Sequence, residues 1–282
     1  MKLNTFYNIY YRHRIEKSNF IKILFIFLLL PINYLVNLIF LEKKINLDKH
    51  VLTNQNLLEK DLTFLFEKFN SDKGDKFINQ YQKPIKKEKE LIDGHNYSSF
   101  YEKYLNPKKN QITNILELGT FKGNATASLF YFFSNAVIDS VDLYPDLSRY
   151  DSKRINKFKV DTGSKDEIQK KILNNSKQYE LIIEDAGHYL KDQIISLFML
   201  FPKLKSGGIF VIEELDFPNV REDMNIYNEK PTLRDILNLI LDKKDFNSDY
   251  ITHLEKDYFL KNFKSINVYK GKFNEIAFIE KK

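Results

Sequence analysis

The sequence of 282 residues has no cysteine, and only 6 of its 44 basic residues are arginine. The missing cysteine excludes a disulfide-stapled fold, a thiolate zinc site, an iron–sulfur cluster and a cysteine nucleophile. The scarcity of arginine weighs against nucleic-acid recognition, which favours the planar guanidinium fork. With 43% hydrophobic and 29% charged residues, the chain has the composition of a packed globular protein.

The positive charge is concentrated at the N-terminus. The formal net charge is +6, and residues 1–60 alone hold nine Lys or Arg against four Asp or Glu. The remaining 222 residues are nearly neutral, with 35 basic and 34 acidic side chains. We therefore expect no nucleic-acid partner, because the basic excess does not belong to the body of the protein.

An apolar stretch, Phe20–Leu41, lies within this basic region and is long enough to cross a bilayer, which takes about 20 residues. Basic residues flank its start: Arg12, Arg14, Lys17 and Lys22. Further residues interrupt it: Pro31, Asn33 and Asn37. No small-residue cleavage site follows, so the stretch makes a poor signal peptide. Three interpretations stay open: a membrane span, an in-plane or re-entrant anchor, and a helical hairpin buried against the body.

From residue 112 onward, apolar runs of strand length alternate with helical stretches. The expected strands are 115–118, 136–141, 158–160, 181–183 and 209–212. The expected helices are 124–133, 165–173, 192–201, 233–241 and 250–263. Segments 266–269 and 275–279 flank a turn with Gly271 and predict a β-hairpin. The pattern predicts an α/β fold with a doubly wound, mostly parallel sheet that ends in an antiparallel hairpin, with ligands at the strands' carboxyl ends.

The segment before residue 112 is expected to be largely helical. Apolar residues at helical spacing predict a helix over 55–70, and 98–105 is expected to form another. The mixed charge run 83–90 predicts a solvated loop. We therefore divide the chain into a basic, apolar helical extension (1–55), a helical N-terminal part of the functional unit (56–110) and the main domain (111–282).

Acidic residues and glycines follow the first two strands. Glu117, Gly119 and Gly123 stand where strand 115–118 gives way to a helix, and glycine there lets the backbone approach a ligand closely. The spacing is not G-x-G-x-x-G, so a dinucleotide pyrophosphate is not favoured. Asp142 ends the second strand, where a carboxylate accepts hydrogen bonds from ribose hydroxyls. Ordinary strand-to-helix turns are the alternative, but Glu117 and Asp142 together favour a nucleoside site, and Asp161 after the third strand is placed to meet its base.

Carboxylates also end the next two strands. Asp185 follows strand 181–183, and Glu213 and Glu214 follow strand 209–212. Adjacent parallel strands place all three at one edge of the sheet, where they repel one another unless they are protonated or share a cation. Oxygen ligands suit Mg²⁺. His188, three residues after Asp185, is a candidate general base, although a lone histidine is more often structural.

These segments resemble class I S-adenosylmethionine-dependent methyltransferases, and among them the mycinamicin and macrocin type of sugar O-methyltransferase. The resemblance covers roughly residues 60–282. It is carried by ILELGTFKG, VDLYPD, IIEDAGHYLKDQIISLFMLFPKLKSGG and FVIEEL, with SDKG and HNYSSFYEKYL upstream. This chain departs from the family in one ligand position, because the family's fourth strand usually ends in Glu-Asp and here ends in Glu213-Glu214.

The resemblance implies a seven-stranded Rossmann-like methyltransferase domain and a role for each candidate residue. The implied contacts to S-adenosylmethionine are Glu117, Gly119 and Gly123 for the methionine part, Asp142 for the ribose and Asp161 for the adenine. The implied Mg²⁺ ligands are Asp185, Glu213 and Glu214, and the implied general base is His188.

The resulting hypothesis is a Mg²⁺-assisted O-methyltransferase that acts on a hydroxyl of a sugar, glycan or similar small acceptor. The alternative is a non-catalytic cofactor-binding or scaffold protein at a membrane, associated with glycan assembly. A cytoplasmic cofactor conflicts with a single span, because a cytoplasmic basic N-terminus would then export the body. We therefore expect a cytoplasmic protein, associated with the inner face of the membrane through residues 20–41, and a homo-oligomer stays an open alternative.

Overall fold

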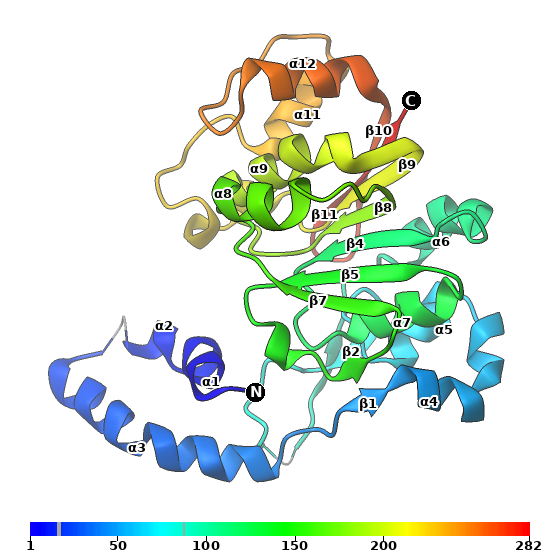
Figure 1. Cartoon of the computed structure of the whole chain (residues 1–282). Helices are drawn as coiled ribbons and strands as arrows, with labels where there is room; N and C mark the ends of the chain where they lie inside the picture. The colour runs from blue at the N-terminus through cyan, green and yellow to red at the C-terminus, as the bar shows by residue number, and fades with distance from the viewer. Residues whose placement is uncertain (16–17, 87) are drawn as a thin grey trace.

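The computed structural model describes residues 1–15, 18–86 and 88–282, and Lys17 of the basic flank lies outside them. A seven-stranded sheet forms the centre of the body, in the order β10-β11-β9-β8-β4-β5-β7 (Figure 1). Its strands are β4 Asn114–Leu118, β5 Val137–Asp142, β7 Ile155–Lys159, β8 Tyr179–Glu184, β9 Leu204–Ile212, β10 Phe263–Lys270 and β11 Glu275–Lys281.

The directions of the strands confirm the predicted α/β fold. β4, β5, β7, β8 and β9 run parallel, whereas β11 is antiparallel to both β9 and β10. The third parallel strand begins at Ile155, earlier than the predicted 158. β7 is an edge strand in which only Ile155 is buried, so its sequence carries little of the apolar signal on which the prediction depends.

Helices cover both faces of the sheet and enclose two apolar cores. One core lies against α9, α11 and α12 and includes Leu116 and Ile182, whereas the other lies against α5, α6 and α7 and includes Ile115 and Leu181. Consecutive residues of a strand point to opposite faces, so the unbroken apolar runs of β4 and β8 supply both cores. The helices are α4 Leu47–Thr53, α5 Leu62–Lys68, α6 Ser98–Leu105, α7 Asn124–Phe132, α8 Lys165–Ile168, α9 Leu190–Leu200, α10 Phe217–Val220, α11 Leu233–Leu241 and α12 His253–Asn262.

The predicted helix over 55–70 is wrong in its extent. Gln55–Glu59 forms a short 3₁₀ helix, and α5 begins only at Leu62. Asp61 lies between them and accepts the backbone N–H of Phe64 at 2.8 Å, so its side chain caps a new helix and interrupts the old one. The predicted helix 233–241 is confirmed as α11. Shorter elements are the strands β1 Ile45–Asn46, β2 Lys76–Ile78, β3 Leu91–Asp93 and β6 Tyr150–Asp151, the 3₁₀ helices Asn106–Lys108, Pro145–Leu147, Phe201–Lys203 and Glu222–Met224, and the π-helix Gln169–Leu173.

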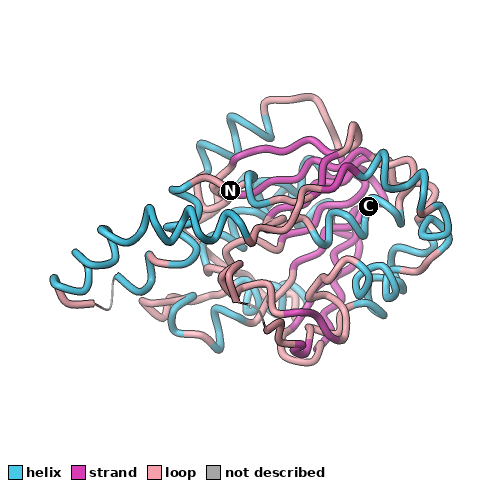
Figure 2. Tube along the Cα trace, turned by 90° about the horizontal axis from the view of Figure 1, so that it is seen from below, coloured by secondary structure: helices cyan, strands magenta, loops and turns pink. Residues whose placement is uncertain are grey.

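The chain before Ile45 forms an arm of three helices: α1 Leu3–Tyr10, α2 Arg12–Ile15 and α3 Phe20–Ile39. Figures 1 and 2 show the arm projecting from one side of the body, and Figure 1 shows α12 at the opposite end of the molecule. α3 is long and apolar enough to cross a membrane, by length and composition. Only 11% of its most apolar window is buried, so the interpretation of a helix buried against the body is wrong.

A few polar contacts hold the arm to the body. The hydroxyl of Thr5 donates to Asp146 at 2.9 Å, and the backbone N–H of Ile85 donates to the side chain of Asn37 at 3.2 Å. The loop 83–90 is therefore not wholly solvated as predicted, because part of it contacts α3. Regular pairing with the body begins at Ile45, where β1 pairs in parallel with β6.

Candidate active site

A cavity of about 660 Å³ lies at the carboxyl ends of the parallel strands. Most of the predicted site residues line it: Glu117, Gly119, Asp142, Asp161, Asp185, His188 and Glu214. Gly123 and Glu213 are not among its lining residues. The sheet therefore brings together most of the predicted set, as the positions at the strand ends indicate.

Gly119 and Gly123 both have a positive φ, of 84° and 79°, which glycine adopts without strain. A Cβ on Gly119 would lie 1.8 Å from the carbonyl oxygen of Asp185, and one on Gly123 would lie 2.8 Å from the Ser148 hydroxyl. The close approach that these glycines permit in this structure is therefore to the protein's own chain. Gly119 also borders the cavity, so its lack of a side chain leaves room there as well.

Glu117, in β4, is buried, with 1% of its surface exposed. It accepts the hydroxyl of Thr126 at 2.6 Å. Burial raises the pKa of Glu117 to about 7, although the Thr126 hydrogen bond acts in the opposite direction. Glu117 can therefore present either a carboxylate or a neutral acid to a ligand near neutral pH.

Asp142 is held by the backbone of the loops around it. Its two oxygens accept the N–H groups of Phe121 and Tyr144, each at 2.7 Å. Burial raises the pKa of Asp142, and these two hydrogen bonds partly oppose that shift. Asp161, beyond β7, is exposed and accepts the N–H of Gly163 at 3.0 Å. Both carboxylates are thus fixed in direction before any ligand arrives.

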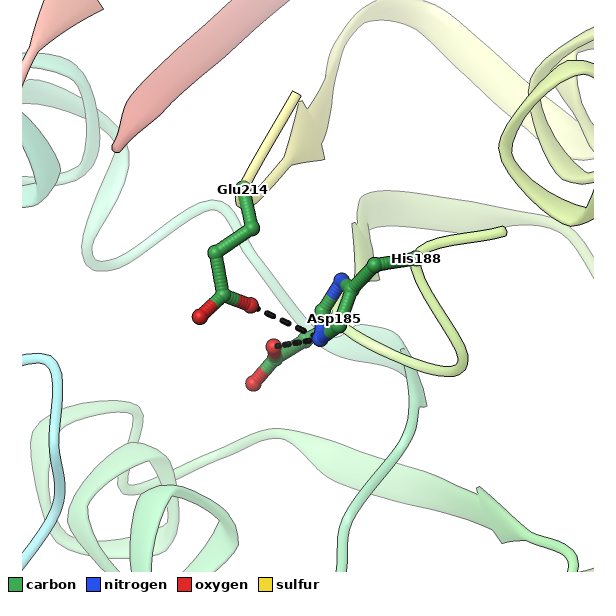
Figure 3. A group of neighbouring side chains, drawn as sticks. All are labelled: Asp185, His188 and Glu214. Carbon is green, nitrogen blue, oxygen red and sulfur yellow. Dashed lines mark ion pairs between the residues drawn. The ribbon is translucent and has the colours of Figure 1, made fainter. Parts of the chain in front are cut away.

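Asp185, His188 and Glu214, which follow β8 and β9, form a compact cluster that also lines the cavity (Figure 3). His188 Nε2 lies 2.7 Å from Glu214 Oε2 and 3.8 Å from Asp185 Oδ1. His188 and Glu214 both adopt positive φ, of 54° and 48°, a conformation that costs free energy in residues other than glycine. The backbone turns that follow β8 and β9 therefore aim these two side chains at one another.

Glu213 lies outside this cluster because two other residues hold its carboxylate. The buried Lys73 ammonium lies 2.7 Å from Glu213 Oε1 and 2.5 Å from Asp185 Oδ2. The Tyr101 hydroxyl also donates to Glu213. Lys73 has only 1% of its side chain exposed, so the site carries an internal cation that the sequence interpretation missed. In the sequence, Lys73 was named only within SDKG, one of the motifs that carry the resemblance, and no role was predicted for it.

His95 is a second missed residue, on the far side of Glu214. Its Nε2 lies 3.0 Å from Glu214 Oε1, and its Nδ1 lies 3.2 Å from the Asn274 amide nitrogen. If Nδ1 accepts from Asn274, Nε2 carries the hydrogen and donates to Glu214. The ring stacks on Tyr97 at 5.3 Å. Each oxygen of Glu214 therefore faces a different histidine.

The charges within the cluster shift the pKa values of its members. Burial acts to lower the pKa of His188, but the neighbouring carboxylates, Glu214 first among them, outweigh it and raise that pKa to about 10. Burial acts to raise the pKa of Glu214, and the two histidines hold it well below its usual range. The His188–Glu214 contact is thus an ion pair in this structure.

The donor atoms of the cluster fit a divalent cation. One ligand atom each from Asp185, His188 and Glu214 lies within 4.8 Å of the others. Lys73 binds the Oδ2 atom of Asp185, which leaves Oδ1 toward the cluster. Two carboxylates suit Mg²⁺, and an added imidazole also suits other divalent metals. Glu213, the third ligand implied by the resemblance, is engaged by Lys73 and Tyr101 instead.

None of the family models searched matches this chain. It is 23% identical over 127 residues to L-olivosyl-oleandolide 3-O-methyltransferase of Streptomyces antibioticus, a match that covers 43% of this chain and 32% of that protein. It is 25% identical over 128 residues to mycinamicin VI 2''-O-methyltransferase of Micromonospora griseorubida, again over 43% of this chain and 32% of the relative. The matches thus span about a third of the length of these curated relatives.

A solved structure is similar over more of the chain. It is the MycE methyltransferase from the mycinamycin biosynthetic pathway, in complex with Mg and SAH. The TM-score is 0.59 at 20% identity, over 79% of this chain and 55% of the other. This likeness shows the fold. Together with the curated relatives it confirms the resemblance of the chain to S-adenosylmethionine-dependent sugar O-methyltransferases.

Proposed function

We propose that this protein transfers the methyl group of S-adenosylmethionine to a hydroxyl of a sugar or a similar small acceptor. One observation carries the proposal. A single cavity joins the buried Glu117 and the half-buried Asp142, two carboxyls that suit a nucleoside-bearing cofactor, to the Asp185–His188–Glu214 cluster. The fold of a methyltransferase and the names of the matched relatives support it. No observation of the structure favours the alternative of a non-catalytic scaffold.

The cofactor binds along the ends of β4, β5 and β7 in this proposal. Asp142, already oriented by Phe121 and Tyr144, accepts the ribose hydroxyls. Glu117 and Gly119 border the methionine part, and Asp161 meets the adenine. Gly123 shapes the turn before α7 and does not reach the cavity. These contacts fix the sulfonium methyl in place, which leaves the enzyme to align the acceptor.

The acceptor hydroxyl lies at the cluster. The carbon–sulfur bond of the sulfonium breaks as the carbon–oxygen bond forms, and the hydroxyl proton leaves to His188 Nε2. A divalent cation, held by Asp185 and Glu214, would make the hydroxyl more acidic and would offset the negative charge that raises the pKa of His188. His95 and Lys73 act as positioning residues, since each holds a carboxylate of the cluster from behind.

Removing the imidazole tests this assignment. His188→Ala should lower turnover of labelled S-adenosylmethionine with a sugar pool by about 10²- to 10⁴-fold, the usual contribution of a general base. Cofactor affinity, measured by calorimetry, should stay unchanged because His188 pairs with Glu214 and Asp185 rather than with Glu117 or Asp142. His253→Ala, at an exposed histidine of α12, is the matched control and should leave both values unaltered.

Two outcomes would count against the proposal. Joint loss of turnover and cofactor binding in His188→Ala would mean that the histidine is structural. Full activity of the wild-type enzyme after dialysis against EDTA would remove the cation from the mechanism and leave His188 alone at the hydroxyl.

A further inference from the structure

In helix α3 the polar side chains face the protein and the apolar side chains face outward, which is the reverse of the usual arrangement in a surface helix. Its polar side chains Asn33, Tyr34 and Asn37 lie on the half-buried or buried side, toward α1 and the body. Its outward side is apolar, with the single exception of Lys22. The exposed apolar residues of this face are Phe20, Ile21, Leu24, Phe25, Phe27, Leu28, Leu29, Ile32, Leu35, Val36 and Ile39. A face of this size on a soluble protein marks a surface that something else covers.

The arm is built so that only one side of α3 is free. The ring of Phe6 on α1 lies 5.6 Å from that of Tyr34, and Tyr7 stacks on Phe27 at 5.7 Å. The Tyr34 hydroxyl donates to the carbonyl of Met1 at 2.9 Å. Because α1 packs along one side of α3 and is itself tied to the body, the free side suits a helix that lies in a surface rather than one that crosses it.

A second cavity, of about 240 Å³, lies where the end of α3 meets the body. Phe40 and Leu41 supply part of its wall, and the basic side chains that line it are Lys44, Lys83, Lys86, Lys89, Lys122 and Arg149. Its two carboxylates are already engaged: Glu42 pairs with Arg149, and Asp146 accepts from Thr5 and from the Lys2 backbone. Arg149 Nε is buried and has no hydrogen-bond partner among the described residues. The cavity thus retains positive charge at the end of α3.

We propose that the arm seats the protein in the plane of an anionic phospholipid membrane. The apolar face of α3 lies among the acyl chains, and the basic cavity at its end receives a lipid phosphate. Charge complementarity selects this partner, because basic residues next to an apolar helix bind anionic lipid surfaces. A second copy of this chain would cover the apolar face, but residues 20–41 contain no Asp or Glu with which a symmetric pairing would meet the basic cavity. The inference goes beyond the proposed reaction and does not depend on it.

Sedimentation of the full-length protein with lipid vesicles tests the proposal. Vesicles of phosphatidylcholine mixed with phosphatidylglycerol should bind the protein at least tenfold more tightly than phosphatidylcholine alone, and high salt should weaken the binding. Lys86→Gln combined with Lys89→Gln should weaken binding to the anionic vesicles by about an order of magnitude. Leu28→Glu combined with Leu35→Glu should abolish binding, because it places charges on residues that are 63% and 61% exposed on the apolar face.

A matched control keeps the experiment specific. Leu254→Glu makes the same chemical change at an apolar residue of α12 that is 82% exposed and far from the arm, and it should bind vesicles as the wild type does. Circular dichroism verifies that each variant is folded. If an arm variant fails to fold, the wild-type comparison of the two vesicle compositions at low and high salt still decides the question.

Three results would overturn the proposal. The first is absence of binding to either vesicle together with a dimer, seen by light scattering, that Leu28→Glu with Leu35→Glu dissociates. The second is binding of inorganic phosphate by calorimetry without any binding to vesicles, which would make the cavity a site for a free anion. The third is retention in the vesicles after alkaline carbonate extraction, which would show a helix that spans the bilayer.

Discussion

The body of the protein and its N-terminal arm differ in which side chains they bury and which they expose. In the body, charged side chains lie inside: Lys73, Glu117 and Glu213 are each 1% exposed. In the arm, apolar side chains lie outside: Phe20 is 78% exposed and Ile39 is 79% exposed. Both arrangements oppose the usual preference of each residue type for interior or solvent.

The two regions balance these costs differently. Burying a charge costs free energy unless the protein pairs it, and the cavity does so with its own residues, Lys73 with Asp185 and Glu213. Exposing a broad apolar face is compensated only by something outside the chain. The body therefore pairs its buried lysine with its own carboxylates, whereas the arm depends on a partner, and the predictions below test this contrast.

The largest effect is expected at the internal cation. Lys73→Met should lower the free energy of unfolding by about 3–5 kcal/mol at neutral pH, because it leaves Asp185 and Glu213 buried without their counter-charge. Urea denaturation measures the change. Lys108→Met is the control, since the Lys108–Glu280 pair is partly exposed and should contribute less than about 1 kcal/mol. Similar losses of unfolding free energy in the two variants would mean that the buried ion pairs contribute no more to stability than the partly exposed one.

A pH-dependent effect is expected at Glu117. Burial raises the folded pKa of Glu117 to about 7, above its ordinary value of 4.5, so the folded state retains a proton that the unfolded state has released. The contribution of Glu117 to stability should therefore fall as pH rises from about 4.5 to about 7, by about 3 kcal/mol. Glu117→Gln does not titrate, so the ligand-free variant should gain about that much over the wild type above pH 7 and nothing below pH 4.5.

Glu280 provides the control of opposite sign. Partial burial acts to raise its pKa, but Lys108 and Lys264 outweigh it and lower that pKa. Glu280→Gln should therefore destabilise the protein at neutral pH and lose this effect as pH falls through the folded pKa of Glu280. A wild-type curve whose slope does not change in Glu117→Gln would show that Glu117 is ionised throughout.

The smallest effect is expected where the arm meets the body. Thr5→Val keeps the shape of the side chain but removes its hydrogen bond to Asp146, which should weaken docking of α1 by about 0.5–1.5 kcal/mol. Hydrogen exchange of the α1 amides should become faster, whereas the amides of β8 serve as an internal control and should not change. Faster exchange in β8 would mean that arm and body unfold as one unit, and the contrast would fail.

The strand ends made much of the site predictable, because parallel strands place their last residues at one edge. Glu117, Asp142, Asp185 and Glu214 all line the cavity for this reason. The choice between Glu213 and Glu214 was not predictable. It depends on the left-handed backbone of Glu214, with φ of 48°, and on the partners that hold Glu213. Neither feature leaves a pattern in the adjacent sequence.

Contacts between residues far apart in the sequence were the second feature of the site that could not be predicted. Lys73 and His95 lie in the SDKG and HNYSSFYEKYL motifs, and only the folded chain brings them to Asp185 and Glu214. The error over 55–70 has a local cause. Asp61 caps α5 with its side chain, but a single polar residue hardly changes the apolar periodicity from which the longer helix was predicted. The alternation of strands and helices, in contrast, is a repeated local signal, and it predicted the sheet correctly.

The placement of Lys73 has a consequence for the order in which this protein assembles. Its partner Asp185 follows it by 112 residues, so the lysine leaves the ribosome long before its counter-charge has been synthesised. Contacts between residues so distant in sequence form late, because a large loop must close first. The sheet strands β4, β5 and β7 can therefore pair while the lysine is still hydrated, and the cavity acquires its final distribution of charge only when the last parallel strands arrive.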